Sequence, residues 1–207
     1  MSTPPRAEAL RIAGPVGALE ALLEDPQLAP GAGFGVVCHP HPLHGGTMQN
    51  KVVHTLARAL QEQGLRTLRF NYRGVGQSEG TYDEGRGERD DALAVIAWGR
   101  ARWPTAPLVL AGFSFGAIVA LRAAPQAHPI RLIMVAPPVS RVPFADITPP
   151  SCPWLIVQGE ADELVDYREV QAWAARFTPA PSLRLLAGVD HFFHGRLHEL
   201  RDAVRSS

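Results

Sequence analysis

The feature that most constrains the fold is a regular alternation of short apolar runs with longer amphipathic segments from residue 34 onward. Runs such as FGVVC (34–38) are continuously apolar, which is typical of strands buried on both faces. Between 50 and 64, apolar residues instead recur at the three- and four-residue spacing of a helix. We therefore expect an α/β fold: a mostly parallel sheet with helices on both faces, in three layers.

Boundaries follow from the apolar runs and from glycine and proline. The predicted strands are 34–38, 65–70, 107–112, 130–136, 152–159 and 183–188. The predicted helices are 50–64, 89–102, 115–124 (ended by Pro125) and 167–177, with a last helix beginning near 192. Upstream, turn residues in GPVG favour a hairpin of 8–12 with 16–23, although ALEALLED also has a helical pattern.

Length and charge bound the class of protein. A chain of 207 residues suits one domain, here 1–207, and the formal net charge of zero suggests neither a nucleic acid nor an anionic membrane as partner. Cys38 and Cys152 lack the spacing of a redox or metal motif, and no apolar stretch approaches a membrane span. We expect a cytoplasmic protein that acts on a small molecule; the oligomeric state stays open.

Parallel sheets bind ligands at the carboxyl ends of their strands, so the residues that follow each strand are the first candidates for chemistry. Ser114 follows strand 107–112 and precedes helix 115–124, between Gly112 and Gly116. Small neighbours allow a tight strand-to-helix turn that exposes the serine hydroxyl above the sheet. This pattern predicts a nucleophile at Ser114.

A serine hydroxyl needs a base to accept its proton, and the base needs an acid to orient it. Asp162 follows strand 152–159 and His191 follows strand 183–188, in the order Ser, acid, His. Asp166 is better placed to cap the next helix, and His194 to lie on a helix face. We predict that Ser114, Asp162 and His191 form a catalytic triad.

The negative oxygen of a tetrahedral intermediate needs N–H donors. The amide of Phe115, directly after the serine, is the first candidate. In HPHPLHGG, Pro40 and Pro42 have no N–H, which leaves the amide of His41 as the predicted second donor.

The same loop offers an alternative chemistry. His39, His41 and His44 have a spacing that resembles metal ligands, although the aspartate typical of zinc-dependent β-lactamase-like hydrolases is missing. We favour the serine mechanism, which needs neither a metal nor another cofactor.

Together these residues resemble an α/β-hydrolase, and more narrowly a cap-less bacterial subfamily of predicted serine hydrolases. The resemblance spans most of the chain and rests on HPHPLHGGTMQNKVV (39–53), LRFNYRGVGQSEG (68–80), GRGERDDALAVIAW (85–98), AGFSFGA (111–117), LIVQGEADELV (155–165) and DHFFHGRL (190–197). It implies hydrolysis of an ester, thioester or similar acyl bond, with Ser114, Asp162 and His191 as the triad.

The segment PPVSRVPFADITPPS after strand 130–136 is too short for a helical cap, which predicts an open site. Phe144 and Phe192 are candidates to line an acyl pocket. We expect a small-substrate carboxylesterase; an acyl thioesterase, an aminopeptidase-like peptidase and a non-catalytic binding scaffold with this fold are the alternatives.

Overall fold

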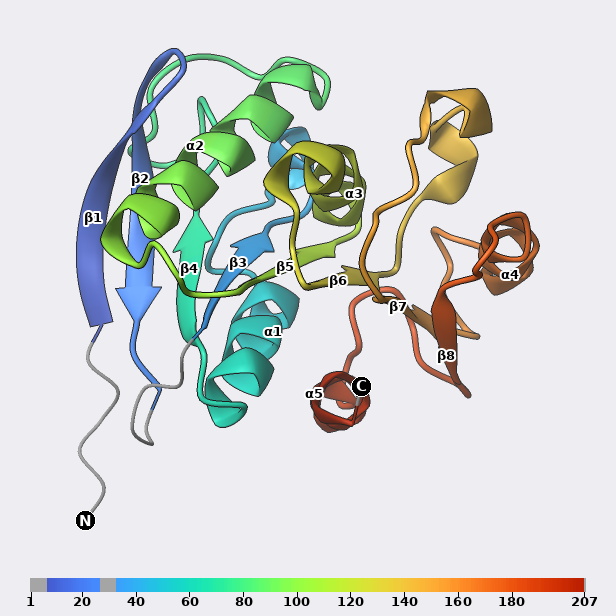
Figure 1. Cartoon of the computed structure of the whole chain (residues 1–207). Helices are drawn as coiled ribbons and strands as arrows, with labels where there is room; N and C mark the ends of the chain where they lie inside the picture. Colours follow the sequence, from blue (N-terminus) through green and yellow to red (C-terminus); the bar gives the residue numbers. More distant parts are fainter. Residues whose placement is uncertain (1–6, 27–32, 207) are drawn as a thin grey trace.

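One mixed sheet organises the protein (Figure 1). The computed structural model describes residues 7–26 and 33–206, and in these residues eight strands run side by side in the order β1-β2-β4-β3-β5-β6-β7-β8. Strands β1, β2 and β4 pair antiparallel, and every pair from β4 to β8 is parallel. The carboxyl ends of β3 to β8 therefore meet at one edge, as the strand–helix alternation predicts.

The strand bounds agree closely with the predicted ones, and the predicted hairpin is present as β1 and β2. The strands are β1 (Ala7–Gly14), β2 (Gly17–Glu24), β3 (Phe34–Cys38), β4 (Arg66–Phe70), β5 (Leu108–Phe113), β6 (Arg131–Val135), β7 (Trp154–Gly159) and β8 (Ser182–Leu186). Strands β3 and β5 are buried along their whole length. This burial accounts for their continuous apolar sequences.

Helices cover both faces of the sheet, as expected (Figure 1). The helices are α1 (Lys51–Glu62), α2 (Arg86–Arg102), α3 (Phe115–Ala127), α4 (Tyr167–Ala174) and α5 (Leu197–Arg205), with short 3-10 turns η1 (Pro42–His44), η2 (Val139–Arg141) and η3 (Phe144–Asp146). Apolar residues of α1 and α5 pack in one core cluster, and those of α2, α3 and α4 in the other. The chain thus has the three-layer architecture of the α/β-hydrolases.

Four predicted helix boundaries were wrong, and the first is the start of α2, which lies at Arg86 instead of 89. Helix α3 passes Pro125 and ends at Ala127, because a proline in the last turn removes one hydrogen bond without stopping the helix; the left-handed backbone of His128 ends it. Helix α4 ends at Ala174. Helix α5 begins at Leu197, since positive φ angles at Phe193 and Gly195 keep the preceding residues in turns.

Within residues 7–26 and 33–206, no cap domain lies over the carboxyl edge of the sheet. The connection from β6 to β7 contains only η2, η3 and irregular chain, as its prolines predict. Among the described residues, no helix has both the length and the apolar character needed to cross a membrane.

Candidate active site

The turn between β5 and α3 forces Ser114 into an unusual conformation. Its φ of 53° and ψ of −120° lie outside the regions that non-glycine residues ordinarily adopt. The Ser114 amide donates to the carbonyl of Val135 on β6, 2.8 Å away, which holds the turn against the sheet. Such strain is typical of a residue positioned for chemistry.

Glycine is required on both sides of Ser114. A Cβ atom added to Gly112 would lie 2.1 Å from the carbonyl oxygen of Gly116. A Cβ atom on Gly116 would lie 2.4 Å from the carbonyl oxygen of Cys38 at the end of β3. The two glycines thus let α3 begin directly against the sheet and against the loop that follows β3.

Ser114, His191 and Asp162 are hydrogen-bonded in series. The distance from Ser114 Oγ to His191 Nε2 is 3.1 Å, and His191 Nδ1 lies 2.8 Å from Asp162 Oδ2. His191 is 3% exposed, and the side chain of Asp162 is inaccessible to solvent. The structure therefore brings together the three side chains that the sequence singled out.

The Asp162 carboxylate is held by donors on both oxygens. The amides of Leu164 and Val165 donate to Oδ1 at 2.9 and 2.8 Å, and Gln158 Nε2 donates to Oδ2 at 2.9 Å. Burial raises the pKa of this carboxyl, but the hydrogen bonds from His191 and the two amides outweigh it, and the pKa lies below its usual value. Asp162 is therefore ionised beside the imidazole.

The sequence analysis did not identify two residues that support this series of hydrogen bonds. Gln158 lies at the end of β7 and bonds Asp162; the signal was a lone polar residue in an apolar strand. Glu163 accepts a hydrogen bond from the backbone amide of His191 at 3.3 Å. Nothing in the sequence distinguished Glu163 from an ordinary surface acid. Asp166, as predicted, caps α4 through the amide of Arg168.

The loop after β3 packs beside the start of α3. The ring centroids of His41 and Phe115 are 4.9 Å apart, and the His41 amide donates to no acceptor among residues 7–26 and 33–206. Phe115 is the first residue of α3, where a backbone amide has no acceptor within the helix. Both predicted donor residues thus lie next to Ser114.

The three histidines of this loop do not converge. His39 is fully buried: Nδ1 lies 2.7 Å from the Pro40 carbonyl oxygen, and Nε2 accepts the Tyr72 amide at 3.1 Å. Burial lowers the pKa of His39 to about 3, so its ring is neutral. His41 and His44 stack on each other at 4.5 Å. Because both ring nitrogens of His39 are engaged elsewhere, the three imidazoles do not form a metal site.

A cavity of about 340 Å³ opens beside Ser114. It is lined by His41, His44, Tyr82, Glu84, Ser114, Phe115, Ile118, Arg122, Pro138, Arg141, Val142, Leu164, Val165 and His191. A second cavity of about 530 Å³ adjoins it and shares Glu84 and Arg122. The two cavities therefore border each other at these two side chains.

The predicted pocket residues Phe144 and Phe192 do not line this cavity. Phe144 lies in η3 and packs on Phe177 at 4.9 Å, under the guanidinium of Arg176. The Phe192 ring packs against the rings of Phe113, His191 and His194. Both predictions were wrong, because each ring finds apolar partners in its own neighbourhood.

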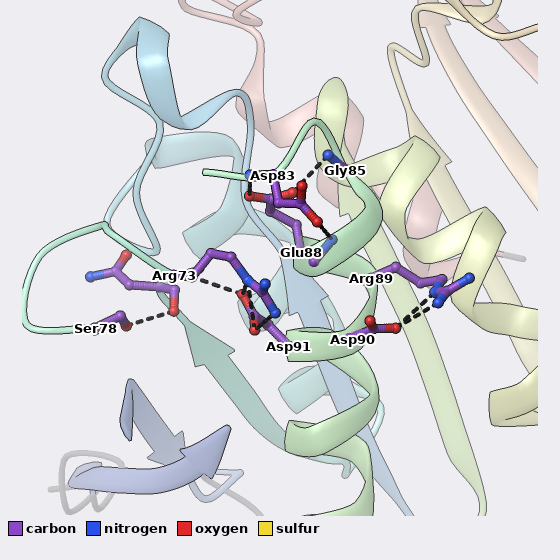
Figure 2. Close-up of polar contacts among 10 residues, drawn as sticks. Arg73, Ser78, Asp83, Gly85, Glu88, Arg89, Asp90 and Asp91 are labelled. Carbon is purple, nitrogen blue, oxygen red and sulfur yellow. Dashed lines mark hydrogen bonds and ion pairs between the residues drawn. The ribbon is translucent and has the colours of Figure 1, made fainter. Parts of the chain in front are cut away.

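Tyr82 lines the cavity, and the buried acids Glu88 and Asp91 hold the chain on either side of it. The Glu88 carboxylate accepts hydrogen bonds from the backbone amides of Asp83, at 2.8 Å, and Gly85, at 2.7 Å. Both residues belong to the segment that follows Tyr82. Further back, Arg73 makes a buried ion pair with Asp91, with Nη2 and Oδ1 2.7 Å apart (Figure 2). The position of Tyr82 is therefore fixed by the chain around it.

Comparison with known proteins agrees with this geometry. Residues 41–150 match the sequence model of a family described as serine aminopeptidase, S33. A structure from Xanthomonas campestris, described as an α/β serine hydrolase without a lid, superposes with a TM-score of 0.93 at 45% identity and covers 100% of this chain and 95% of the other. This chain is a member of the lidless α/β serine hydrolases.

Two further relatives extend over nearly the whole hydrolase chain. An α/β serine hydrolase homologue from Coxiella burnetii has a TM-score of 0.93 and 48% identity, covering 96% of each chain. An uncharacterised protein from Rickettsia prowazekii is 34% identical over 201 residues, which are 92% of this chain and 84% of that protein. The similarity therefore extends beyond the residues matched by the family model.

Proposed function

We propose that this hydrolase is a serine carboxylesterase that cleaves small esters through an acyl-enzyme intermediate. The observation that carries the proposal is the series of hydrogen bonds from Ser114 through His191 to Asp162, next to an open cavity. Each contact is short enough for proton transfer or orientation without rearrangement of the fold.

In the first half of the reaction, Ser114 Oγ attacks the ester carbonyl while His191 Nε2 takes the hydroxyl proton. The amides of Phe115 and His41 stabilise the resulting oxyanion. The carbon–oxygen bond to the alcohol then breaks, and His191 delivers its proton to the leaving oxygen. Asp162 keeps the Nδ1 proton of His191 in place throughout.

In the second half, water attacks the acyl-serine carbonyl and gives its proton to His191. The tetrahedral intermediate then collapses, the acid leaves, and Ser114 recovers its proton from the imidazole. Cys38 plays no part as a nucleophile, because burial raises the pKa of its thiol to about 12.

The cavity argues for an ester rather than a peptide with a free amino terminus. An aminopeptidase must hold a substrate ammonium group, for which a carboxylate in the pocket is the usual partner. Here two arginines, Arg122 and Arg141, line the cavity, and Glu84 is paired with Arg86 at 3.4 Å. An ammonium group would be repelled from such a pocket.

The test is covalent labelling followed by kinetics. A fluorophosphonate probe should attach to Ser114 of the wild type, located by mass spectrometry, and should not attach to Ser114→Ala. With p-nitrophenyl acetate and butyrate, Ser114→Ala should lower kcat by about 10⁴–10⁶-fold with the fold intact by circular dichroism.

A parallel panel of acyl-CoA thioesters and aminoacyl p-nitroanilides separates the alternative activities. If the esters have the highest kcat/KM, the result supports a carboxylesterase. A higher kcat/KM for a thioester would instead indicate a thioesterase, and a higher value for an anilide would indicate an aminopeptidase. A wild type that the probe does not label would instead favour a non-catalytic scaffold.

A further inference from the structure

Two arginines line the cavity beside Ser114 without a carboxylate partner. Within the described part of the chain, neither Arg122 nor Arg141 takes part in a side-chain hydrogen bond or ion pair. The arginines near the adjoining cavity differ, since Arg86 pairs with Asp83 and Glu84, and Arg89 pairs with Asp90 at 2.7 Å. Among the four arginines that line the two cavities, Arg122 and Arg141 are therefore the two without an acidic partner in residues 7–26 and 33–206.

The two guanidinium groups come from separate elements. Phe115, Ile118 and Arg122 are spaced by three and four residues on α3, so they share the helix face that lines the cavity. A Cβ atom built on Gly85 would lie 3.2 Å from Arg122 Nη1 and 3.5 Å from the Phe115 ring. The Arg122 guanidinium therefore lies next to the residue that follows the nucleophile.

Arg141 enters from η2, in the connection after β6. Its charge reaches His41, whose pKa is lowered first by burial and then by the charges of His44 and Arg141. Among the described residues that line this cavity, Glu84 is the one with an acidic side chain. That side chain is 72% exposed and is already paired with Arg86. The positive charge of the cavity is therefore not neutralised from within.

Tyr82 adds a hydrogen-bond donor. The Leu43 amide donates to His41 Nδ1 at 3.3 Å, which leaves the proton of the neutral imidazole on Nε2. Nε2 lies 3.2 Å from the Tyr82 hydroxyl and donates to its oxygen. The hydroxyl hydrogen of Tyr82 then remains for an acceptor in the cavity.

We propose, building on the esterase function above, that the substrate carries a carboxylate that Arg122 and Arg141 bind, with Tyr82 as an additional donor. Guanidinium groups pair with carboxylates in two parallel hydrogen bonds, which gives both affinity and orientation. The carboxylate belongs either to the acyl chain or to the alcohol, and the two positions are separable by experiment.

The experiment compares matched esters that differ only in charge. The acyl arm uses the p-nitrophenyl monoester of glutaric acid against that of glutaramic acid, with spontaneous hydrolysis subtracted. The alcohol arm uses the butyrate ester of 3-hydroxybenzoic acid against that of 3-hydroxybenzamide. We expect kcat/KM for the carboxylate ester to exceed that of the amide by about tenfold or more in one arm, and this excess to shrink as salt is raised.

Variants assign the preference to the arginines. Arg122→Gln and Arg141→Gln should each remove most of the preference. Arg122→Lys should keep part of it, because charge without the planar fork binds carboxylates less well. Arg58→Gln, on the opposite face of the sheet in α1, is the charge-matched control and should keep the wild-type ratio.

The outcomes separate this proposal from the one on which it rests. Hydrolysis of the amide esters with no carboxylate preference in either arm overturns the carboxylate inference and leaves the esterase intact. A preference that survives both arginine substitutions also overturns it. Failure to hydrolyse any of the four esters, with no fluorophosphonate label at Ser114, rejects the esterase and the carboxylate together.

Discussion

The two walls of the active-site cavity are built on different principles. The elbow wall, formed by Ser114, Phe115 and Ile118 of the β5–α3 turn, is fixed by backbone contacts that leave no room for a Cβ atom at Gly112 or Gly116. The loop wall, formed by Tyr82, Glu84, Pro138, Arg141 and Val142, consists of side chains on connections between elements. One wall is determined by sterics, and the other by the choice of side chains.

The difference separates reaction from substrate. The elbow wall holds Ser114 in a strained conformation, 3.1 Å from His191, which lies 2.8 Å from Asp162. The proposed reaction depends on these contacts. The loop wall carries charged and polar groups with few partners, which tolerate replacement without loss of the fold. We therefore expect substitutions in the elbow wall to abolish activity or lower stability. Substitutions in the loop wall, and of Arg122 farther along α3, should change selectivity.

After Ser114→Ala, the largest effect in this comparison is expected for Asp162→Asn. Oδ1 accepts the amides of Leu164 and Val165, so the oxygen of the asparagine must stay there and its NH₂ group must face His191. The NH₂ would donate to Nδ1 and leave the proton on Nε2, where the ring cannot accept the proton of Ser114. We expect kcat/KM for p-nitrophenyl butyrate to fall by about 10³–10⁴-fold.

Glu163→Gln is the matched control, since it also removes a carboxylate near His191 but contacts only the backbone amide. It should lose less than about tenfold. An Asp162→Asn enzyme with more than a tenth of wild-type activity would contradict the role given to Asp162, provided circular dichroism shows that both variants are folded.

The next effect concerns the backbone of the elbow. Gly116→Ala should lower the free energy of unfolding by about 3 kcal/mol, because its Cβ atom would clash with the carbonyl of Cys38 and neither backbone segment can move freely. Gly195→Ala adds the same methyl group where no atom lies within 4 Å, and the cost there should be about 1 kcal/mol from its φ of 69°. Urea denaturation measures both, and equal costs would show that the elbow is not sterically fixed.

The same division explains what the sequence predicted. The strand–helix alternation defined the sheet, and the order of Ser114, Asp162 and His191 at the ends of three strands identified the residues that now lie within hydrogen-bonding distance. These features repeat along the chain or are forced by sterics, so they are visible locally. The assignment of catalytic roles remains a prediction until the variants are measured.

Pocket residues were harder to predict because loop side chains choose partners from anywhere in the fold. Phe144 was expected in the pocket but packs on Phe177, while Arg122 and Tyr82 line the cavity without a motif that would identify them. The start of α5 was misplaced for a similar reason, since the positive φ at Phe193 depends on tertiary packing that a sequence pattern does not encode.

The smallest of these effects tests whether the loop after β3 belongs with the elbow wall. Burial holds the pKa of His39 at about 3, against about 6.5 in an unfolded chain. The unfolded state therefore binds more protons between these values, and stability must fall as pH drops through that window. Between pH 6.5 and 4.5, the protonation of His39 in the unfolded state should remove about 2 kcal/mol of unfolding free energy. His39→Gln should show a correspondingly flatter slope in urea denaturation at these pH values, whereas the loop-wall variant Arg141→Gln should keep the wild-type slope. If His39→Gln and the wild type had the same slope, the ring would be open to protonation in the folded state, and the loop that carries His41 would belong with the adaptable wall instead.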